Sequence, residues 1–383
     1  MHPTSYHDVA DDESDTWSMK SGSTGFAPSV ASSATTVDWE MRSASRPPSV
    51  FSFTSSLRAN AFRQEFGRGL NNYSEVYRLP ADEEELERLD KQHIMFMEVM
   101  GKYPPPMIEI LADNTPGETK TCVDLGCGSG SWFVSPQYNY ASRAYSSCGA
   151  LPRRILDVAR DFPHVSSVAV DLVPMQVLDM PPNCRSEVDD INLGLQHFYG
   201  DFNVVHARLI SSGIRDYQGL VDHIAFTVRP GGLIHLTEFD FRVYGLNKRP
   251  IPIDHNASAI AKWMNLAREA VKHQGGEPDA ANHLNEWIST QGSFEDVVYR
   301  HWWFQTSPWN PGHDADSRRV NRHGALMRDD ILSFLKSGRP LLLGTGIPEH
   351  VVNDYEDAAR RELLEGKVPG YILVENVYAR RRR

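Results

Sequence analysis

The segment VDLGCGSGSW, Val123 to Trp132, decides how this sequence is interpreted. It begins as the end of a short apolar strand, and glycines then follow at positions 126, 128 and 130 with the spacing G-x-G-x-G. Glycines after a strand let the backbone turn tightly and approach a ligand where no Cβ would fit. The pattern predicts a ligand-binding turn with Asp124 at its edge. A glycine turn with a purely structural role is the alternative.

The glycine spacing differs from that of a dinucleotide-binding turn. The spacing G-x-G-x-x-G would place the third glycine at 131, where this chain has serine. A pyrophosphate at a helix N-terminus would also be repelled by the Asp124 carboxylate. A ligand with a cationic methionyl end and no phosphate, such as S-adenosylmethionine, would be attracted by it. The turn therefore favours S-adenosylmethionine over a nicotinamide cofactor.

Short apolar segments alternate with helical patterns from Lys120 onward. Four of them are bounded by turn residues, as buried parallel strands are, and these predicted strands are 121–125, 166–172, 202–209 and 232–239. The amphipathic segment 216–228 ends at Arg229-Pro230-Gly231-Gly232, which we expect to be a helix stop and a turn. The alternation predicts a doubly wound α/β sheet with right-handed crossovers.

The composition limits the partners and the compartment. The formal net charge of −11 argues against a nucleic-acid binder or an anionic-membrane binder, which would present a basic face. The four cysteines, at 122, 127, 148 and 184, show no zinc-ligand spacing and suit a reduced intracellular protein. We see no signal peptide and no transmembrane segment. We expect a cytoplasmic or nuclear protein that is not secreted and binds no metal.

The chain divides into three predicted parts. Residues 1–56 contain 20 Ser or Thr and no sustained periodicity, so we expect a disordered tail. Residues 73–118 form an N-terminal helical segment, and residues 119–383 form the main domain. Within that domain we expect a helical and aromatic region at about 246–345 and a final strand at 371–381. Further helices are predicted at 256–273, 279–290, 328–337 and 349–365.

The sequence resembles the class I S-adenosylmethionine-dependent methyltransferases, and particularly the fungal group related to methyltransferase-like regulators of secondary metabolism. The glycine motif identifies the superfamily, and a longer series of segments between Tyr77 and Arg381 points to the fungal group. These segments are YRLPADEEELERLDKQH (77–93), VDLGCGSGSW (123–132), VAVDLVP (168–174), VDDINLGL (188–195), FNVVHARLI (202–210), RPGGLIHLTEFDFRVY (229–244) and YILVENVYARR (371–381).

The resemblance implies a fold and an activity. The fold would be a Rossmann-like, mostly parallel sheet of seven strands with N-terminal helices and a helical substrate cap. The activity would be in-line methyl transfer from S-adenosylmethionine to a small-molecule or protein acceptor, in secondary metabolism. The alternative is a non-catalytic or weakly catalytic regulator that acts through protein partners, because fold alone does not separate the two functions.

The resemblance also assigns candidate site residues. Gly126, Gly128 and Gly130 would line the methionyl and ribose part of the cofactor, and Asp124 would lie near its amino group. Asp171 would take both ribose hydroxyls, since one carboxylate accepts two parallel hydrogen bonds. Asp190 would receive the adenine amino group, with Ile191 as its apolar neighbour. Turn or cap acids are the alternative for Asp171 and Asp190.

Three further features have two interpretations each. His206 and Arg208 follow the fourth strand, where the methyl-transfer centre would open, and His206 is the candidate catalytic base, with a structural role as the alternative. Arg208 is grouped with the cofactor-binding residues. His93 is expected to be a packed helix residue rather than a ligand. The aromatic residues Trp302, Trp303, Phe304 and Trp309 are candidate acceptor-pocket walls or core residues.

One spacing departs from the expected pattern. Asp171 lies 41 residues after Gly130, whereas the acid that holds the ribose lies about 20 residues past the glycines in such folds. Removing the 22 residues 133–154 restores a gap of 19 and joins Trp132 to a helical stripe of Ile155, Leu156, Val158, Ala159 and Phe162. The removed segment has no Asp or Glu, and Val134-Ser135 can be encoded by a splice-donor sequence. Residues 133–154 are therefore either a retained intron or a surface loop. If they are translated, we expect weaker cofactor binding.

Overall fold

The computed structural model describes residues 60–128, 154–175 and 180–383, and all of these belong to one compact unit, Phe53–Arg383. The predicted tail 1–56 and nearly all of the segment 133–154 lie outside the described residues, as does Gly130. The described chain begins with a hairpin of β1, Phe62–Glu65, and β2, Arg68–Asn71, which precedes the expected helical segment.

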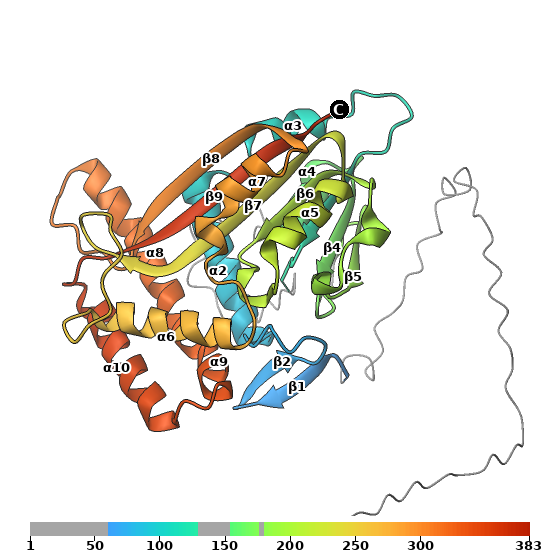
Figure 1. The fold of residues 1–383 in the computed structure, drawn as a ribbon. Helices are drawn as coiled ribbons and strands as arrows, with labels where there is room; N and C mark the ends of the chain where they lie inside the picture. The colour runs from blue at the N-terminus through green and yellow to red at the C-terminus, as the bar shows by residue number, and fades with distance from the viewer. Residues whose placement is uncertain (1–59, 129–153, 176–179) are drawn as a thin grey trace, which may run out of the picture. The chain divides into compact units, whose positions relative to one another are not determined.

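A seven-stranded sheet forms the centre of the unit (Figure 1). Its strand order is β5-β4-β3-β6-β7-β9-β8, and β9 is antiparallel to both of its neighbours, whereas the other pairs are parallel. The strands are β3 (Thr121–Leu125), β4 (Ser166–Asp171), β5 (Cys184–Val188), β6 (Phe202–Arg208), β7 (Val228–Tyr244), β8 (Phe294–Gln305) and β9 (Tyr371–Arg381). This order confirms the predicted doubly wound, mostly parallel sheet. The sequence of strands runs outward in opposite directions from β3 and from β6, and such sheets bind ligands at this switch point.

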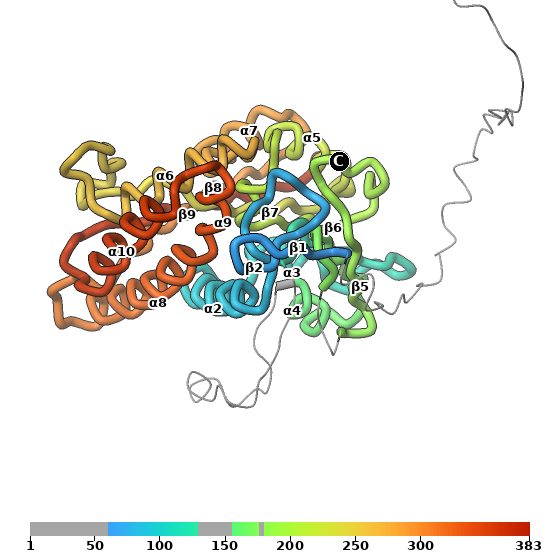
Figure 2. The backbone as a smooth tube through the Cα atoms, turned by 90° about the horizontal axis from the view of Figure 1, so that it is seen from below, coloured from blue at the N-terminus to red at the C-terminus, as the bar shows by residue number. Residues whose placement is uncertain are grey.

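Helices cover both faces of the sheet, and Figures 1 and 2 agree on their sides. One face packs against α5, Tyr217–Thr227, and α7, Leu284–Thr290, through a core that includes Leu125, Val205 and Ile224. The other face packs against α3, Pro105–Ile110, and α4, Arg154–Asp161. The two cores bury the apolar residues on each side of the central strands, which explains their continuous apolar sequences.

A third apolar core lies where the N-terminal helix meets the helices from the C-terminal half. The helix α2, Glu83–Met100, begins at Asp82, whose side chain accepts the Glu85 N–H, and three glutamates in its first turn suit the helix dipole. This core joins α2 to the extended end of β7. The other helices in it are α6 (Ala259–His273), α8 (Ala315–Ser337), α9 (Arg339–Gly344) and α10 (Glu349–Glu365).

The structure differs from the sequence-based expectation at Arg229–Gly232. The helix α5 ends at Thr227, and the next residues form an irregularity inside β7 rather than a turn before it. The register shifts between Phe202 and Val204 of β6. Gly231 has a φ of 78°, and a Cβ on Gly232 would lie 2.6 Å from the Asn203 carbonyl oxygen. Both glycines are therefore needed by a bulge pressed against β6.

Two elements in the range 246–345 also differ from expectation. The aromatic segment forms the strand β8, and ten of its twelve residues pair with β9 at the sheet edge. The helix α8 starts at Ala315, well before the expected 328, because the Asp314 side chain caps it by accepting the Ser317 N–H at 2.9 Å. The predicted helical stripe after the segment 133–154 does form α4, and Ile155, Leu156, Val158 and Ala159 are buried in it.

Candidate functional site

The glycine turn follows β3 at the point where the strand order reverses. The Cys127 N–H donates to the Val170 carbonyl at 2.9 Å, and the Gly128 N–H donates to Oδ2 of Asp171 at 2.8 Å. Gly126 has a φ of 66°, and a Cβ there would lie 2.4 Å from Cγ2 of Ile210. The turn is therefore tied to β4 and pressed against the chain that follows β6, and only glycine fits at position 126.

The two acids predicted to hold the cofactor both lie at turns. Asp171 also accepts the Val173 N–H at 3.3 Å, so its carboxylate shapes the end of β4 as well as the glycine turn. Asp190 accepts the backbone and side-chain N–H groups of Asn192 and caps the short helix η3, Ile191–Leu193. Asn192 in turn donates to the Gly213 carbonyl at 2.8 Å. Both acids thus have the capping role that the sequence left as an alternative, in addition to facing a cavity.

A cavity of about 150 Å³ lies against this turn and continues under α2. Of the predicted site residues, it is lined by Gly126, Gly128, Asp171, Asp190, Ile191 and Arg208. The structure therefore brings these six positions together from β3, β4, β6 and the loop after β5. We call this space the main cavity. The predicted role of each residue toward the cofactor stays a prediction.

Asp124 and His206 lie elsewhere, on the face of the sheet that packs against α4. They are paired across β3 and β6, and Nδ1 of His206 lies 2.7 Å from Oδ1 of Asp124. His235 is the next residue in this row on β7, with its ring 5.1 Å from that of His206. Burial, together with nearby His206 and Arg208, lowers the pKa of His235 well below its ordinary value. All three side chains line a second cavity of about 70 Å³ between the sheet and the helices α2, α3 and α4.

Arg208 lies between the two cavities and lines both. Its NH2 lies 3.0 Å from Nδ1 of His93, and its guanidinium stacks 5.1 Å from the centre of the Phe96 ring. Nε2 of His93 lies 3.7 Å from Oδ2 of Asp157. His93 is thus buried in the interface between α2, α4 and β6, as the packed helix residue that the sequence predicted.

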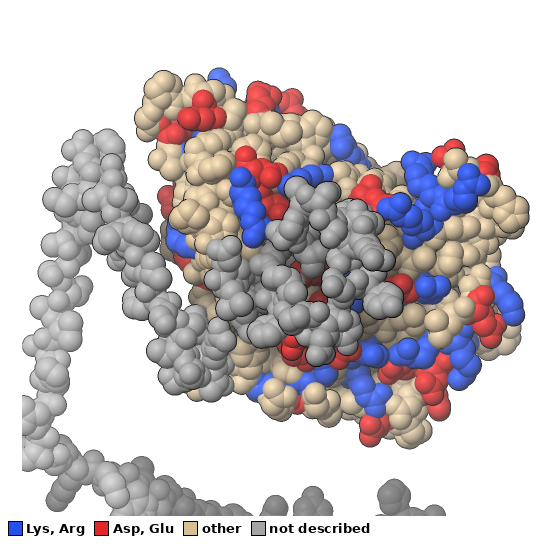
Figure 3. Space-filling view, turned by 180° about the vertical axis from the view of Figure 1, so that it is seen from behind, with Lys and Arg blue, Asp and Glu red and all other residues tan. Residues whose placement is uncertain are grey.

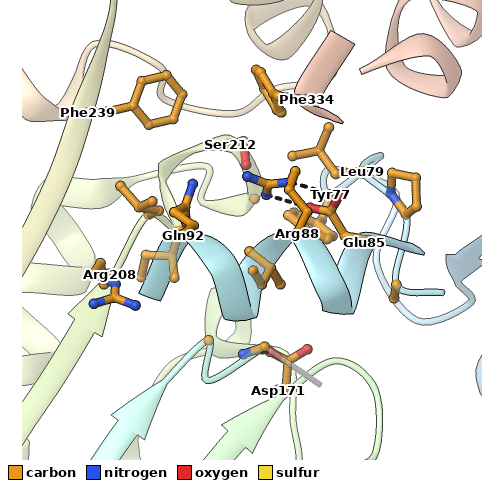
Figure 4. Close-up of a pocket in the computed structure, with 18 of the residues that line it drawn as sticks. Tyr77, Leu79, Glu85, Arg88, Gln92, Asp171, Arg208, Ser212, Phe239 and Phe334 are labelled. Carbon is orange, nitrogen blue, oxygen red and sulfur yellow. Dashed lines mark hydrogen bonds and ion pairs between the residues drawn. The ribbon is translucent and has the colours of Figure 1, made fainter. Parts of the chain in front are cut away.

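The sequence analysis did not identify the buried charged cluster of α2 and α8. Arg88 donates to both carboxylate oxygens of Glu85 and, at 2.9 Å, to Oδ1 of Asp330, and Gln92 donates to Oδ2 of Asp330 at 3.0 Å. All four side chains line the main cavity. In Figure 4, Arg88 and Gln92 extend from α2 toward Phe239 and Phe334, on the side of the helix away from Asp171. The spacing of residues 85, 88 and 92 puts their side chains on one face of the helix. Asp330 lies 242 residues from Arg88, and no local sequence pattern indicates that the two are in contact.

The aromatic cluster of β8 does not line the main cavity. Phe304 is buried against Phe96, and the Trp303 ring packs edge-on against Tyr244. Trp309 donates from Nε1 to the Gly370 carbonyl, and Trp302 alone of the four lines the second cavity. These residues therefore pack within and beside the edge of the sheet. Among the described residues, no group of His, Cys, Asp and Glu is arranged to hold a metal ion.

Comparison with known proteins identifies the family. A family model described as a methyltransferase domain matches residues 100–292, which include β3 to β7 and the turn. The chain is 42% identical to the secondary metabolism regulator laeA of Coprinopsis cinerea over 83% of this chain and 74% of that protein. It is 27% identical to laeA of Aspergillus fumisynnematus over 68% of this chain and 61% of that protein. It is also 22% identical to methyltransferase str2 of Strobilurus tenacellus over 77% of this chain and 93% of that protein.

The matched region contains the elements that carry the site: the glycine turn, the acids at the ends of β4 and β5, and Arg208 on β6. The sheet order agrees with the class that the sequence predicted. The family model covers five of the seven strands of this sheet, β3 to β7. The chain is a member of the methyltransferase domain family.

Proposed function

We propose that this protein is a methyltransferase that binds S-adenosylmethionine across the ends of β3 and β4 and methylates an acceptor in the adjoining part of the main cavity. One observation supports this most strongly: a single cavity is lined by the glycine turn, by both predicted cofactor acids and by apolar side chains of α2, α6 and α8. Methyltransferase domains use S-adenosylmethionine as the methyl donor, and membership in the family therefore implies this cofactor.

The chain's own residues would hold the cofactor as follows. Asp171 accepts the ribose hydroxyls, and Asp190 with Ile191 receives the adenine ring, since these residues line the cavity beside the glycine turn. The backbone at Gly126 and Gly128 allows close approach. When bound, the cofactor supplies an activated methyl group. Catalysis then depends mostly on positioning and on exclusion of water, for which a buried apolar chamber is suited.

His206 is the proposed base where the acceptor must lose a proton. Nδ1 of His206 lies 2.7 Å from Oδ1 of Asp124, so a neutral imidazole would carry its proton on Nδ1 and its basic lone pair on Nε2. Because His206 lines the second cavity, a proton from the main cavity has to pass Arg208 and Phe96, which line both. This route supports a role for Arg208 in placing the reacting groups.

Calorimetry with S-adenosylhomocysteine, the demethylated cofactor, tests the cofactor site. Asp171→Asn and Asp190→Asn should each weaken binding about ten-fold or more, since a charged hydrogen bond contributes roughly 1.5–3 kcal/mol. Asp216→Asn is the matched control, because Asp216 caps α5 in the same way but does not line the main cavity. Unchanged affinity in both cavity variants, or no binding by the natural chain, would show that the site is not used.

A second function, that of a methyltransferase-like regulator acting through protein partners, is favoured by the relative with 42% identity, which is named a secondary metabolism regulator. A measurement of catalytic turnover distinguishes the two functions. Formation of S-adenosylhomocysteine from added S-adenosylmethionine in the presence of fungal extract, by the natural chain but not by Asp171→Asn, supports the enzyme. Equal capture of partner proteins by both chains, with no release by either, supports the regulator.

The acceptor, the partners and the location belong to the same proposal. We infer a cytoplasmic or nuclear protein that does not bind nucleic acid. The three cysteines in the described ranges, Cys122, Cys127 and Cys184, are buried free thiols, which suits a reducing compartment. On the face shown in Figure 3, acidic and basic side chains of the described residues are interspersed rather than gathered in a basic stripe. No helix of the described ranges is long and apolar enough to cross a membrane.

A further inference from the structure

The part of the main cavity beyond Arg208 is walled by apolar side chains from three elements. We call it the acceptor chamber and define it by Phe239, Phe241, Met264, Met327, Ile331 and Phe334. Phe239 and Phe241 belong to β7, Met264 to α6 and the other three to α8, and all six belong to one apolar core. Ligand pockets with such walls bind apolar molecules and orient them by a few polar groups.

One polar cluster faces this chamber, and its charged atoms are already partnered. The guanidinium of Arg88 donates from Nε and NH2 to Glu85 and from NH1 to Asp330. Both oxygens of Glu85 accept from Arg88, and one also accepts the Ser337 hydroxyl. Asp330 accepts from Arg88 and Gln92. Each nitrogen of the guanidinium thus donates to a carboxylate, and a cluster of two carboxylates and one guanidinium would repel an anion.

Gln92 is the uncharged member of this cluster. Its Nε2 donates to Asp330, and within the described residues no hydrogen bond uses its carbonyl Oε1. Figure 4 shows the side chain extending from α2 into the cavity. A carbonyl oxygen accepts from a hydroxyl or an amine. The chamber thus offers apolar walls, and the Gln92 carbonyl beside them is a hydrogen-bond acceptor.

The apolar walls of the acceptor chamber restrict the ligand further. A protein side chain would have to bring its polar backbone against the same apolar walls, at the cost of burying unpaired amides. A compact molecule meets no such cost.

Resting on the proposed function, we infer that the acceptor is a small, uncharged and mostly apolar molecule whose hydroxyl or amino group donates a hydrogen bond to Gln92. In the reaction, a lone pair of that oxygen or nitrogen, or of another on the same molecule, forms the bond to the methyl carbon. The carbon–sulfur bond of the cofactor breaks and its electron pair stays on sulfur. The proton of the attacking group passes by way of Arg208 to His206, the base proposed above.

Three probes of one shape test this inference on the full-length protein by calorimetry, with S-adenosylhomocysteine saturating. They are neutral 4-ethylphenol, anionic 4-ethylbenzoate and wholly apolar 4-ethyltoluene. We expect 4-ethylphenol to bind at least about ten-fold more tightly than 4-ethylbenzoate. Gln92→Leu should weaken 4-ethylphenol about five- to ten-fold, the size of one hydrogen bond, and leave 4-ethyltoluene within two-fold. Equal or tighter binding of the anion, or an equal effect of Gln92→Leu on both neutral probes, would overturn the inference.

A filling variant locates the site. Ile331→Trp should remove the binding of both neutral probes, and the matched change at an exposed isoleucine, Ile108→Trp, should not. Probe binding that survives Ile331→Trp would also overturn the inference. S-adenosylhomocysteine binding by each variant reports that it is folded. If the natural chain fails to bind S-adenosylhomocysteine, the proposed function is wrong. In that case the three probes, added without S-adenosylhomocysteine, still test whether the acceptor chamber binds such molecules.

Discussion

At the scale of single residues, Gly126 couples the site to the fold. A side chain at this position meets two separate costs, a left-handed backbone and a contact of 2.4 Å with Ile210. Gly126→Ala should therefore lower the free energy of unfolding by about 2–4 kcal/mol, of which about 1–2 kcal/mol is the backbone cost. Urea unfolding measures this difference.

The control for Gly126 is Gly117→Ala. Gly117 has a φ of 82° but no atom within 4 Å of an added Cβ, so it carries the backbone cost alone. The difference between the two variants isolates the contact with Ile210. Equal losses of stability would show that the turn yields to a methyl group, and the steric account of position 126 would be wrong.

Glu238 gives the protein a pH-dependent stability. Its carboxyl accepts the Ile210 N–H at 2.9 Å and the Tyr217 hydroxyl at 3.0 Å, and burial raises its pKa to about 7 against these opposing hydrogen bonds. The folded state therefore binds a proton that the unfolded state releases between about pH 4.5 and 7, and stability falls as the pH rises through this range.

Glu238→Gln tests this dependence, because an amide does not titrate. From pH 5 to pH 8, the natural chain should lose about 1–3 kcal/mol relative to the Glu238→Gln variant, as measured by urea unfolding at each pH. The exposed change Glu87→Gln should show no such trend. Parallel curves for the natural chain and Glu238→Gln would mean that Glu238 stays charged in the folded state.

At the scale of elements, the sequence predicted the parts whose signals are local. The strands β3, β4 and β6 each follow from an apolar run bounded by turn residues, β9 follows from its alternation of residues that favour strands, and α4 follows from its buried stripe. The bulge at Arg229–Gly232 was not predicted, because Pro and Gly mark a turn and a bulge alike, and only contact with Asn203 distinguishes them. The strand β8 was missed because its identity depends on pairing with β9.

The same distinction applies to the candidate site. Glycines and acids at strand ends are found locally, since the carboxyl ends of parallel strands meet at one edge of the sheet. The buried charged cluster that faces the acceptor chamber joins α2 to α8, and its contact between Arg88 and Asp330 spans 242 residues. No periodicity encodes such a contact. The sequence placed His206 correctly near the end of β6. The side chain lies on the face of the sheet that packs against α4, beside Asp124, and this depends on the register between β3 and β6.

The buried charged cluster should stabilise the contact between α2 and α8. Arg88→Met leaves Glu85 and Asp330 buried without their cation, so we expect a loss of about 3–5 kcal/mol in the free energy of unfolding. Adding Asp330→Asn should restore part of it. Arg319→Met, which breaks an exposed pair with Asp316, is the control and should cost less than about 1 kcal/mol. If Arg88→Met costs no more than Arg319→Met, the cluster does not hold the helices together.

At the scale of the whole molecule, the segment 133–154 raises the question of whether this chain has the activity of its family. The described chain ends at Gly128 on one side and resumes at Arg154, where α4 begins. In the family that the sequence resembles, the helix follows the glycine turn directly, so its N-terminus lies near the bound cofactor. Splicing of the transcript across these codons would identify the segment as a retained intron.

The corresponding prediction concerns cofactor affinity. A chain lacking residues 133–154 joins Trp132 to Ile155, and the turn and α4 are then held together before the ligand arrives. Preorganisation of this kind reduces the entropy lost on binding, so we expect S-adenosylhomocysteine to bind roughly ten-fold more tightly to the shortened chain. Calorimetry on both chains measures this. A chain lacking residues 1–56 is the control and should bind like the full chain, since no residue of that tail is expected at the site. Equal affinity of all three chains would mean that residues 133–154 are accommodated as a surface loop without effect on the glycine turn. The full chain would then bind the cofactor as well as a chain with the usual spacing between the turn and the helix.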